Sequence, residues 1–297
     1  MIRNLFRRIC AIAGAAAVAG CATIPSAPQA SAPALWKVAD QDTIIYLFGT
    51  IHMLPQGHQW RTPLLDQAIA SSEELVIETL IGDDPMASAQ QMAKLGTSPG
   101  LRPVIERVPE GKRDALRKVI AQSKIPEASL NRLETWAAAM VLTSVSFRQM
   151  GLDPALGVEK GLEAEYKDNA RPIRGLETVE EQLSLFDKLS EDSQRKFLAS
   201  VVEDPAESRK QFQAMLDGWS RGDVNKMART FDADLREWPE LREALLSRRN
   251  ANWAKWIDER LDRPGIVMVA VGAGHLAGPE SVQKMLEGRG IKAIRIQ

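Results

Sequence analysis

The sequence has little of the chemistry that would mark a common enzyme class. It contains only three histidines and two cysteines in 297 residues, and its formal net charge of -1 shows no excess of Lys and Arg. Basic and acidic residues are interleaved along most of the chain, which argues against a nucleic-acid-binding surface. The sequence also lacks a Gly-x-Ser-x-Gly elbow, a Gly-rich phosphate-binding loop and a His-Glu-x-x-His helix. These absences leave serine-hydrolase, nucleotide-binding and zincin functions without support.

The N-terminus lacks an apolar run long enough to cross a bilayer, but it carries a short Ala-rich stretch over residues 9–19. Three arginines within residues 3–8 precede this stretch, which ends in Val18-Ala19-Gly20-Cys21. The pattern is typical of a secretory signal peptide, and its ending resembles a bacterial lipobox, in which the cysteine is lipidated and becomes the mature N-terminus. We therefore expect residues 1–21 to be a lipoprotein signal with Cys21 as the lipidation site. A plain signal peptide with an incidental cysteine is the alternative.

Residues 22–34 contain no charged side chain and consist mainly of Ala, Ser and Pro. This composition predicts an extended tether in front of a single domain at residues 35–297. The acyl chains of a bacterial lipoprotein would hold the domain at a membrane, so we expect it in the cell envelope, facing the periplasm. Ala22 stands where an Asp often marks inner-membrane retention, which favours the outer membrane.

Two of the three histidines occur in the same local pattern, more than two hundred residues apart. In each segment an apolar run predicts a strand, Gly-x-x-His follows, and a loop and a Pro-initiated helix come next. Glycine lets the backbone approach a metal or a substrate closely, so we interpret the segments as two halves of one site. The third histidine, His58, is expected at the surface. The residues of the two segments assigned to the site are Gly49, His52, Gly272, Gly274 and His275.

Strand-like and helix-like segments alternate along most of residues 35–297. This order predicts an α/β (α+β) fold with a mixed sheet built from the two related strand-Gly-x-x-His-helix halves, and a large helical insertion at about residues 83–240. In such sheets, functional crevices lie beyond the carboxyl ends of the strands. A capping box at Thr178 and Glu181 predicts a helix directly after Glu177. The polar residues at predicted strand ends, which we expect to lie together, are His52, Glu78, Glu177 and His275.

Two imidazoles and one or two carboxylates are a donor set suited to Zn²⁺, Mn²⁺, Co²⁺ or Fe²⁺. We expect His52, Glu78 and His275 to hold a divalent ion, with Mn²⁺, Co²⁺ and Zn²⁺ as the main candidates. Such an ion lowers the pKa of a bound water toward about 7 and polarises a carbonyl, and Glu78 or Glu177 could act as general base. The competing interpretation is structural, with histidines bonded to the backbone and glutamates that cap a helix or pair with an arginine.

An arginine falls on the apolar side of a helix predicted over about residues 241–261. Three apolar residues share one face at helical spacing, and Arg249 lies inside that stripe. A guanidinium that faces the core needs a carboxylate or a backbone oxygen as its partner, whereas a side chain that snorkels to solvent is the alternative. We therefore group Arg249 with Glu78 and Glu177 as candidate catalytic residues, with Arg174 as another possible partner of the glutamates.

Taken as an ordered set, the motif segments resemble the TraB/GumN family, which is related to the animal Tiki metalloproteases. The resemblance covers nearly all of the chain after the tether. It implies a two-histidine, glutamate-containing centre, dependence on a divalent metal, and peptidase or related hydrolase activity at a membrane surface. It also implies a fold similar to the erythromycin-esterase and ChaN-like α/β proteins, built from two related halves. The segments that carry it are Leu47–His52, Leu75–Glu78, Arg174–Thr178, Arg249–Asn250 and Val271–Leu276.

Two functions from different classes fit these patterns. The first is a membrane-anchored, divalent-metal-dependent hydrolase, foremost a peptidase that acts on peptide or protein substrates with metal-activated water. The second is a non-catalytic periplasmic binding lipoprotein that holds haem, a peptide signal or an envelope polymer in the same crevice. Metal-dependent cleavage of a peptide would distinguish the enzyme from the binding protein.

Overall fold

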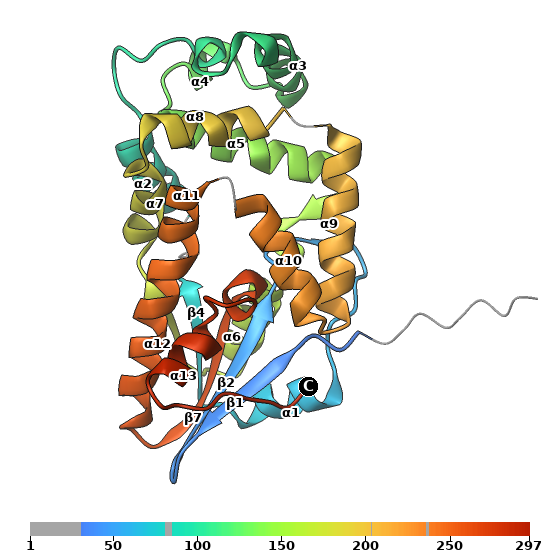
Figure 1. Cartoon of the computed structure of the whole chain (residues 1–297), viewed down its shortest axis with the longest axis vertical. Helices are drawn as coiled ribbons and strands as arrows, with labels where there is room; N and C mark the ends of the chain where they lie inside the picture. Colours follow the sequence, from blue (N-terminus) through green and yellow to red (C-terminus); the bar gives the residue numbers. More distant parts are fainter. Residues whose placement is uncertain (1–30, 81–84, 203, 236–237) are drawn as a thin grey trace, which may run out of the picture. The chain divides into compact units, whose positions relative to one another are not determined.

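The computed structural model describes residues 31–80, 85–202, 204–235 and 238–297 (Figure 1). The expected signal segment, Cys21 and residues 22–30 of the expected tether lie outside the described residues. The last tether residues contact the folded domain, since the amide of Ala32 donates to the carbonyl of Ser220 at 2.7 Å. Within the described ranges, no helix is long and apolar enough to cross a membrane.

A mixed sheet of six strands confirms the predicted α/β (α+β) class. The strands are β1 (Leu35–Ala39), β2 (Thr43–Thr50), β4 (Glu74–Thr79), β6 (Ile173–Glu177), β7 (Gly265–Gly272) and β8 (Ile294–Arg295). Their order is β6-β4-β7-β2-β1-β8. The strands from β6 to β2 run parallel, whereas β1 is antiparallel to β2 and β8 is antiparallel to β1. Strands β1 and β2 thus form an antiparallel hairpin, and the short strand β8 pairs with its outer edge.

The central strands β2 and β7 separate two apolar cores. Near-continuous apolar runs are typical of parallel strands that are covered on both faces. Alternate side chains of β7 point to opposite faces, so Met268 joins one apolar cluster and Val267 joins the other. Each fully buried aliphatic side chain contributes about 1.5–3 kcal/mol, and the two layers together fix the strand ends. The helices that close the first face are α1 (Pro63–Ser71) and α6 (Val158–Asp168), and those on the second are α12 (Arg248–Leu261) and α13 (Val282–Gly288) (Figure 1).

Two helical stretches account for most of the predicted insertion, and residues 152–177 between them return to the sheet as α6 and β6. Leu142 and Leu198 belong to a separate apolar cluster that packs α5 against α8 (Figure 1). The first stretch contains α2 (Pro85–Gly96), α3 (Arg113–Ser123), α4 (Glu127–Leu130) and α5 (Thr135–Gln149). The second contains α7 (Val179–Asp187), α8 (Glu191–Ser200), α9 (Pro205–Ser220), α10 (Val224–Leu235) and α11 (Pro239–Arg242).

The two Gly-x-x-His halves are alike up to the histidine and differ beyond it. After His52 the chain reaches α1 as predicted, with Thr62 as its N-cap. After His275 the predicted helix is present as α13, but Pro279 does not open it. Gly278 adopts a φ of +85°, which turns the chain, and α13 begins only at residue 282. The two halves therefore share the strand, the Gly-x-x-His segment and a later helix, but only the first of these helices begins at a proline.

Candidate functional site

The carboxyl ends of four neighbouring strands bring the motif residues to one edge of the sheet. β2 and β7 are adjacent and parallel, with Thr50 opposite Gly272, so both Gly-x-x-His segments leave the sheet side by side (Figure 1). β4 and β6 continue the same edge, with Thr79 opposite Glu177. Parallel pairing places the predicted residues of the four strands together, as strand ends in an α/β sheet lead us to expect.

Gly272 lies where three of the predicted side chains converge. A Cβ atom at this position would stand 3.0 Å from Glu78 Oε1, 3.4 Å from His52 Nε2 and 3.6 Å from His275 Cδ2. The amide of Gly272 also donates to Glu78 Oε1 at 2.7 Å, and that oxygen is 3.6 Å from His275 Nε2. A larger residue would fill the space between the three side chains, so this position requires glycine.

The other two motif glycines allow close packing of neighbouring elements and do not face the three converging side chains. A Cβ on Gly49 would stand 3.0 Å from the Cα of Ala273, in the 3-10 turn η5 (Ala273–Leu276) that carries His275. A Cβ on Gly274 would stand 3.1 Å from the ring of Phe231 in α10. The sequence interpretation, in which each motif glycine opens the backbone toward a ligand, therefore fits Gly272 and not Gly49 or Gly274.

His52 is the more open of the two motif histidines, with 62% of its side-chain surface exposed. Its Nδ1 atom lies 2.6 Å from Oε1 of Glu159, in the first turn of α6. Desolvation opposes a charged imidazole, but the attraction of Glu159, aided by Glu78, outweighs it and raises the pKa of His52 to about 9. Desolvation likewise disfavours the Glu159 carboxylate, yet the contact with His52 lowers its pKa below the usual range.

The sequence patterns did not identify Glu159. Its role depends on contact with a segment more than a hundred residues away. The amide of Val158 donates to the carbonyl of Ile51 at 3.1 Å, and a Cβ on Gly157 would collide with the carbonyl oxygen of His52. The one local signal is a glycine directly before the helix, because only a residue without a side chain permits this close approach.

His275 is buried, and both of its ring nitrogens are hydrogen-bonded. Nη1 of Arg249 lies 3.1 Å from Nε2, and Oδ1 of Asn250 lies 2.6 Å from Nδ1. Since a guanidinium only donates, this network assigns Nε2 as the acceptor and Nδ1–H as the donor to Asn250. Burial lowers the pKa of His275 to about 3, so the ring is neutral. The ring of Trp253 packs against it, with centroids 4.4 Å apart.

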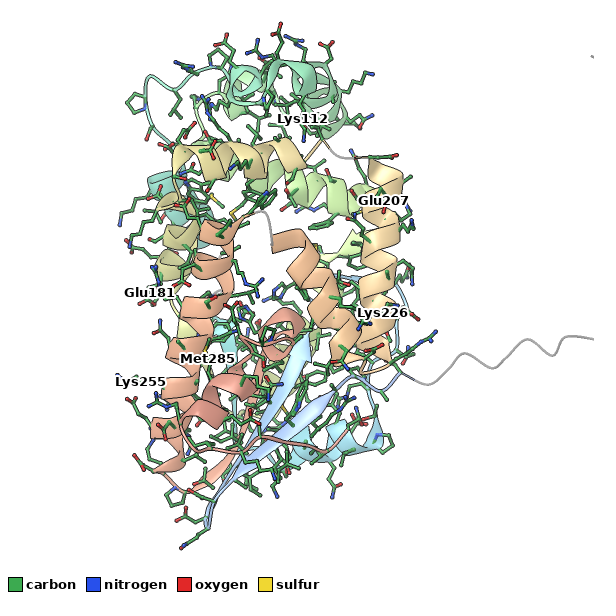
Figure 2. All side chains as sticks on the ribbon, in the orientation of Figure 1. Lys112, Glu181, Glu207, Lys226, Lys255 and Met285 are labelled. Atoms are coloured by element: carbon green, nitrogen blue, oxygen red, sulfur yellow. The ribbon has the colours of Figure 1, made fainter. Side chains whose placement is uncertain are left out.

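Arg249 is buried on the sheet side of α12, whereas Lys255 of the same helix is exposed on its outer side (Figure 2). Its Nε and Nη2 atoms each lie 2.8 Å from an oxygen of Glu177, and Nη2 donates to Glu78 at 2.6 Å. Nη1 donates to the carbonyl of Leu245 at 3.3 Å as well as to His275. The helical spacing therefore indicated the correct face, and the snorkelling alternative is wrong.

The guanidinium of Arg249 is saturated by these contacts. An arginine has five N–H donors, and the contacts with Glu177, Glu78, Leu245 and His275 engage all three of its nitrogens. Arg249 thus holds the surrounding groups in place and has no donor directed to a substrate among these described contacts. The helix that positions it begins after a π-helical segment, Glu243–Ser247, a feature that is frequent at functional sites.

The carboxylates of Glu78 and Glu177 differ in what surrounds them. Burial raises the pKa of Glu78, but the neighbouring His275 and Arg249 together hold it at about 2, so the group is ionised. Its Oε2 atom also accepts from Gln182 of α7 at 3.2 Å. Glu177 directs both oxygens to Arg249, which fits the ion-pair interpretation.

The neighbours of these carboxylates also follow the sequence patterns. The predicted capping box forms, because the hydroxyl of Thr178 accepts from the amide of Glu181 and the Glu181 carboxylate accepts from the amide of Thr178. Arg174, the other possible partner of the glutamates, pairs instead with Glu74 at 3.1 Å. His58, expected at the surface, is half-buried, with Nε2 lying 3.0 Å from the hydroxyl of Ser220.

The donor types at this edge fit a divalent cation. His52 Nε2, His275 Nε2 and Glu78 Oε1 face the same space, and each imidazole is held through Nδ1 by an oxygen, as metal-binding histidines usually are. Among the described residues, no three such side chains already stand at coordination spacing. Because Nη1 of Arg249 occupies the lone pair of His275 Nε2, an ion bound there must displace that hydrogen bond.

Comparison with known proteins agrees with the ordered motifs. The "Uncharacterized protein YbaP" of Escherichia coli (strain K12) is 25% identical over 244 residues, which cover 81% of this chain and 87% of that protein. The protein of the same name from Shigella flexneri matches equally. No solved structure matches this chain. The model of the TraB/PrgY/gumN family matches residues 34–295, and the chain therefore belongs to the TraB/PrgY/gumN family.

Proposed function

We propose that this protein is a membrane-anchored, divalent-metal-dependent hydrolase that cleaves peptides. The observation that carries the proposal is the convergence at Gly272. Glu78 Oε1 and the imidazoles of His52 and His275 lie within 3.0–3.6 Å of the position that a Cβ on this glycine would take. His52 presents Nε2 to that space because its Nδ1 is tied to Glu159, whereas His275 is held by Asn250 through Nδ1 and would present Nε2 only after its hydrogen bond from Arg249 is displaced. Two oriented imidazoles and a carboxylate are a donor set typical of catalytic zinc sites.

The charge around this point favours a cation. Glu78 and Glu177 share the single guanidinium of Arg249, and a third carboxylate, that of Glu159, pairs with His52. His52 adds positive charge only while it is protonated, and an ion that takes up its Nε2 lone pair replaces that proton. Binding of a divalent ion therefore relieves the excess of negative charge at this edge of the sheet.

The residues divide into holding and orienting groups. His52, Glu78 and His275 would hold the ion, which supplies activation of a water molecule and polarisation of a carbonyl. Glu177 keeps Arg249 in place with both of its oxygens, so we assign Glu78 as the carboxylate nearest to the reacting atoms. Asn250 fixes the tautomer of His275 through its Oδ1 atom.

Metal binding tests the first part of this proposal. The full chain, purified in detergent and stripped with a chelator, is titrated calorimetrically with Mn²⁺, Co²⁺ and Zn²⁺. We expect one ion per chain and at least a tenfold weaker affinity in His52→Ala, because one ligand is lost. His58→Ala is the matched control, since this histidine contacts Ser220 instead. Failure of the unmodified chain to bind any of the three ions would sink the proposal.

Cleavage of a peptide library, followed by mass spectrometry, tests the reaction. We expect fragments that require the ion and disappear in His275→Ala. Peptides as the substrate class rest on the resemblance to the Tiki metalloproteases. Peptides that are retained but not cut would favour the binding lipoprotein over the enzyme.

Membrane attachment is proposed from the lipobox-like residues that end at Cys21, with the outer membrane and a periplasm-facing domain as the expected location. Fractionation of cells that express the chain tests this. Cys21→Ser should move the protein from the membrane to the soluble fraction, and intact mass should show the acyl chains only in the unmodified chain. Equal distribution of both forms would contradict a lipid anchor.

A further inference from the structure

We infer that Glu159 is a positioning residue. It holds the His52 ring through Nδ1 and so orients the Nε2 atom of His52 toward Glu78 and His275. The inference rests on the proposed function and deepens it, because it names a residue of α6 that the two Gly-x-x-His segments need. The sequence patterns place no functional residue on this helix, and its carboxylate is brought to the site by tertiary structure alone.

The first step is that α6 is fixed directly to the His52 segment. Its N-terminal amide at Val158 donates to the carbonyl of Ile51 at 3.1 Å. Gly157 packs so closely on His52 that a Cβ would collide with its carbonyl oxygen. The first turn of α6 therefore has a defined position relative to the histidine, and Glu159 reaches Nδ1 from that turn at 2.6 Å.

The second step is that the carboxylate itself is held on another side. The hydroxyl of Thr50, on the last residue of β2, donates to the same Oε1 atom of Glu159. Thr50 is 1% exposed, whereas the side chain of His52 is 62% exposed. A rigid buried residue thus anchors Glu159, and Glu159 in turn anchors a side chain that solvent would otherwise leave free to rotate.

The third step concerns the ring nitrogen that remains. With Nδ1 bonded to a carboxylate, Nε2 is the nitrogen that faces Gly272, 3.4 Å from the position that a Cβ on this glycine would take. Carboxylates that bond to the second nitrogen of a ligand histidine fix its orientation and raise its basicity, and their loss typically weakens metal affinity about 10–100-fold. His275 receives the corresponding support from a neutral amide, Asn250.

The test compares Glu159→Ala and Glu159→Gln with Glu163→Gln in the full chain in detergent. Glu163 lies one turn further along α6, is buried and pairs with Lys160, so it controls for removal of a carboxylate from this helix. We expect Mn²⁺ affinity about 10–100-fold weaker in Glu159→Ala, partial recovery in Glu159→Gln because its carbonyl still accepts from Nδ1, and no change in Glu163→Gln.

A second readout does not need the metal. The chain has only three histidines, so selective ¹³C labelling of their rings gives few signals, which His52→Ala, His58→Ala and His275→Ala assign. In the metal-free chain we expect the His52 ring to be as rigid as the backbone, and to become mobile in Glu159→Ala while the His275 ring is unchanged.

The outcomes separate this inference from the proposed function. If the unmodified chain binds no ion but its His52 ring loses rigidity in Glu159→Ala, the metal proposal fails and the positioning role stands. If Glu159→Ala binds Mn²⁺ as the unmodified chain does, or leaves the His52 ring rigid, the positioning role is overturned. Unfolding midpoints in urea identify a variant that fails to fold, and in that case Glu159→Gln decides by the same two readouts.

Discussion

The two Gly-x-x-His segments share a pattern and a place in the sheet, yet they create opposite environments. His52 keeps most of its side chain in solvent and contacts a carboxylate, which raises its pKa to about 9 although desolvation acts against the charge. His275 is enclosed between Arg249 and Trp253, and its burial lowers its pKa to about 3. One half therefore offers an open, carboxylate-supported ring, and the other a neutral ring locked into the core.

The difference comes from neighbours that lie far away in the sequence. Glu159 arrives on α6, which packs on one face of the sheet, and Arg249 with Asn250 arrives on α12, which packs on the other face. A motif of four residues fixes where a histidine leaves the sheet, but it does not fix the charge state or the mobility of the ring. An asymmetric pair suits a site in which one ligand is structural and the other meets solvent.

The largest loss of stability is expected when the guanidinium of Arg249, which contacts His275, is removed. Arg249→Met leaves the buried carboxylate of Glu78 and the partly buried carboxylate of Glu177 without their guanidinium partner, which should lower the free energy of unfolding by about 3–5 kcal/mol. Urea unfolding of the metal-free full chain measures it. Adding Glu177→Gln to the same chain should recover part of the loss, because one uncompensated charge is removed.

The neighbouring Arg248 is the matched control for Arg249. Its side chain is 65% exposed and lies 3.7 Å from Glu243, so Arg248→Met should change the free energy of unfolding by no more than about 0.5 kcal/mol. Equal losses in Arg248→Met and Arg249→Met would show that the buried guanidinium does not hold this half together.

Removal of His275 should lower the free energy of unfolding more than removal of His52. His275→Ala removes a buried ring and leaves Asn250 and Arg249 with unmatched polar groups, at an expected loss of about 2–3 kcal/mol. His52→Ala removes a mostly exposed ring and should lose less than about 1 kcal/mol. Urea unfolding of both variants in metal-free buffer provides the measurement. A loss in His52→Ala as large as that in His275→Ala would contradict the asymmetry.

The motif glycines allow a comparison of backbone packing with site chemistry. A side chain at Gly49 would press on the backbone of Ala273, so Gly49→Ala should destabilise the fold by about 1–3 kcal/mol. A side chain at Gly272 would instead press on the side-chain ends of Glu78 and His52. Gly272→Ala should therefore lose less stability but weaken Mn²⁺ binding. The reverse order in urea unfolding would show that Gly49 has room for a side chain.

Much of the site's framework could be predicted from the sequence because it follows from local rules. Apolar runs gave the strands, the capping box placed the helix after Glu177, and helical spacing put Arg249 on the buried side. Parallel strands then bring their ends to one edge. What local rules do not contain is the packing of α6 and α12 on that edge, which selects the partners of each histidine.

The features that the sequence did not predict also depend on how distant segments pack. Glu159 has no local signal beyond Gly157, since its contact with His52 exists only once α6 is docked. The helix expected to open at Pro279 begins only at Val282, because the positive φ of Gly278 turns the chain first. The exposed fraction of His52 likewise depends on which helices cover the edge, and the sequence of the segment does not specify them.

The smallest expected effect concerns the residue pair at which the two halves face each other in register, Thr50 and Gly272. On the β2 side a buried hydroxyl steadies Glu159, and on the β7 side the absence of a side chain admits Glu78. Thr50→Val keeps the shape of the side chain and removes its donor to Glu159. We expect a loss of about 0.5–1.5 kcal/mol in urea unfolding.

Mn²⁺ affinity in Thr50→Val should fall by less than in Glu159→Ala, because the carboxylate still reaches His52 when its second support is gone. The control is Thr97→Val, directly after α2, where an exposed hydroxyl donates to the carbonyl of Ala93 in that helix, and where affinity should be unchanged. Affinity in Thr50→Val equal to that of the unmodified chain would mean that Glu159 is held by α6 alone. A fall as large as in Glu159→Ala would mean that the β2 hydroxyl, through Glu159, sets the orientation of His52.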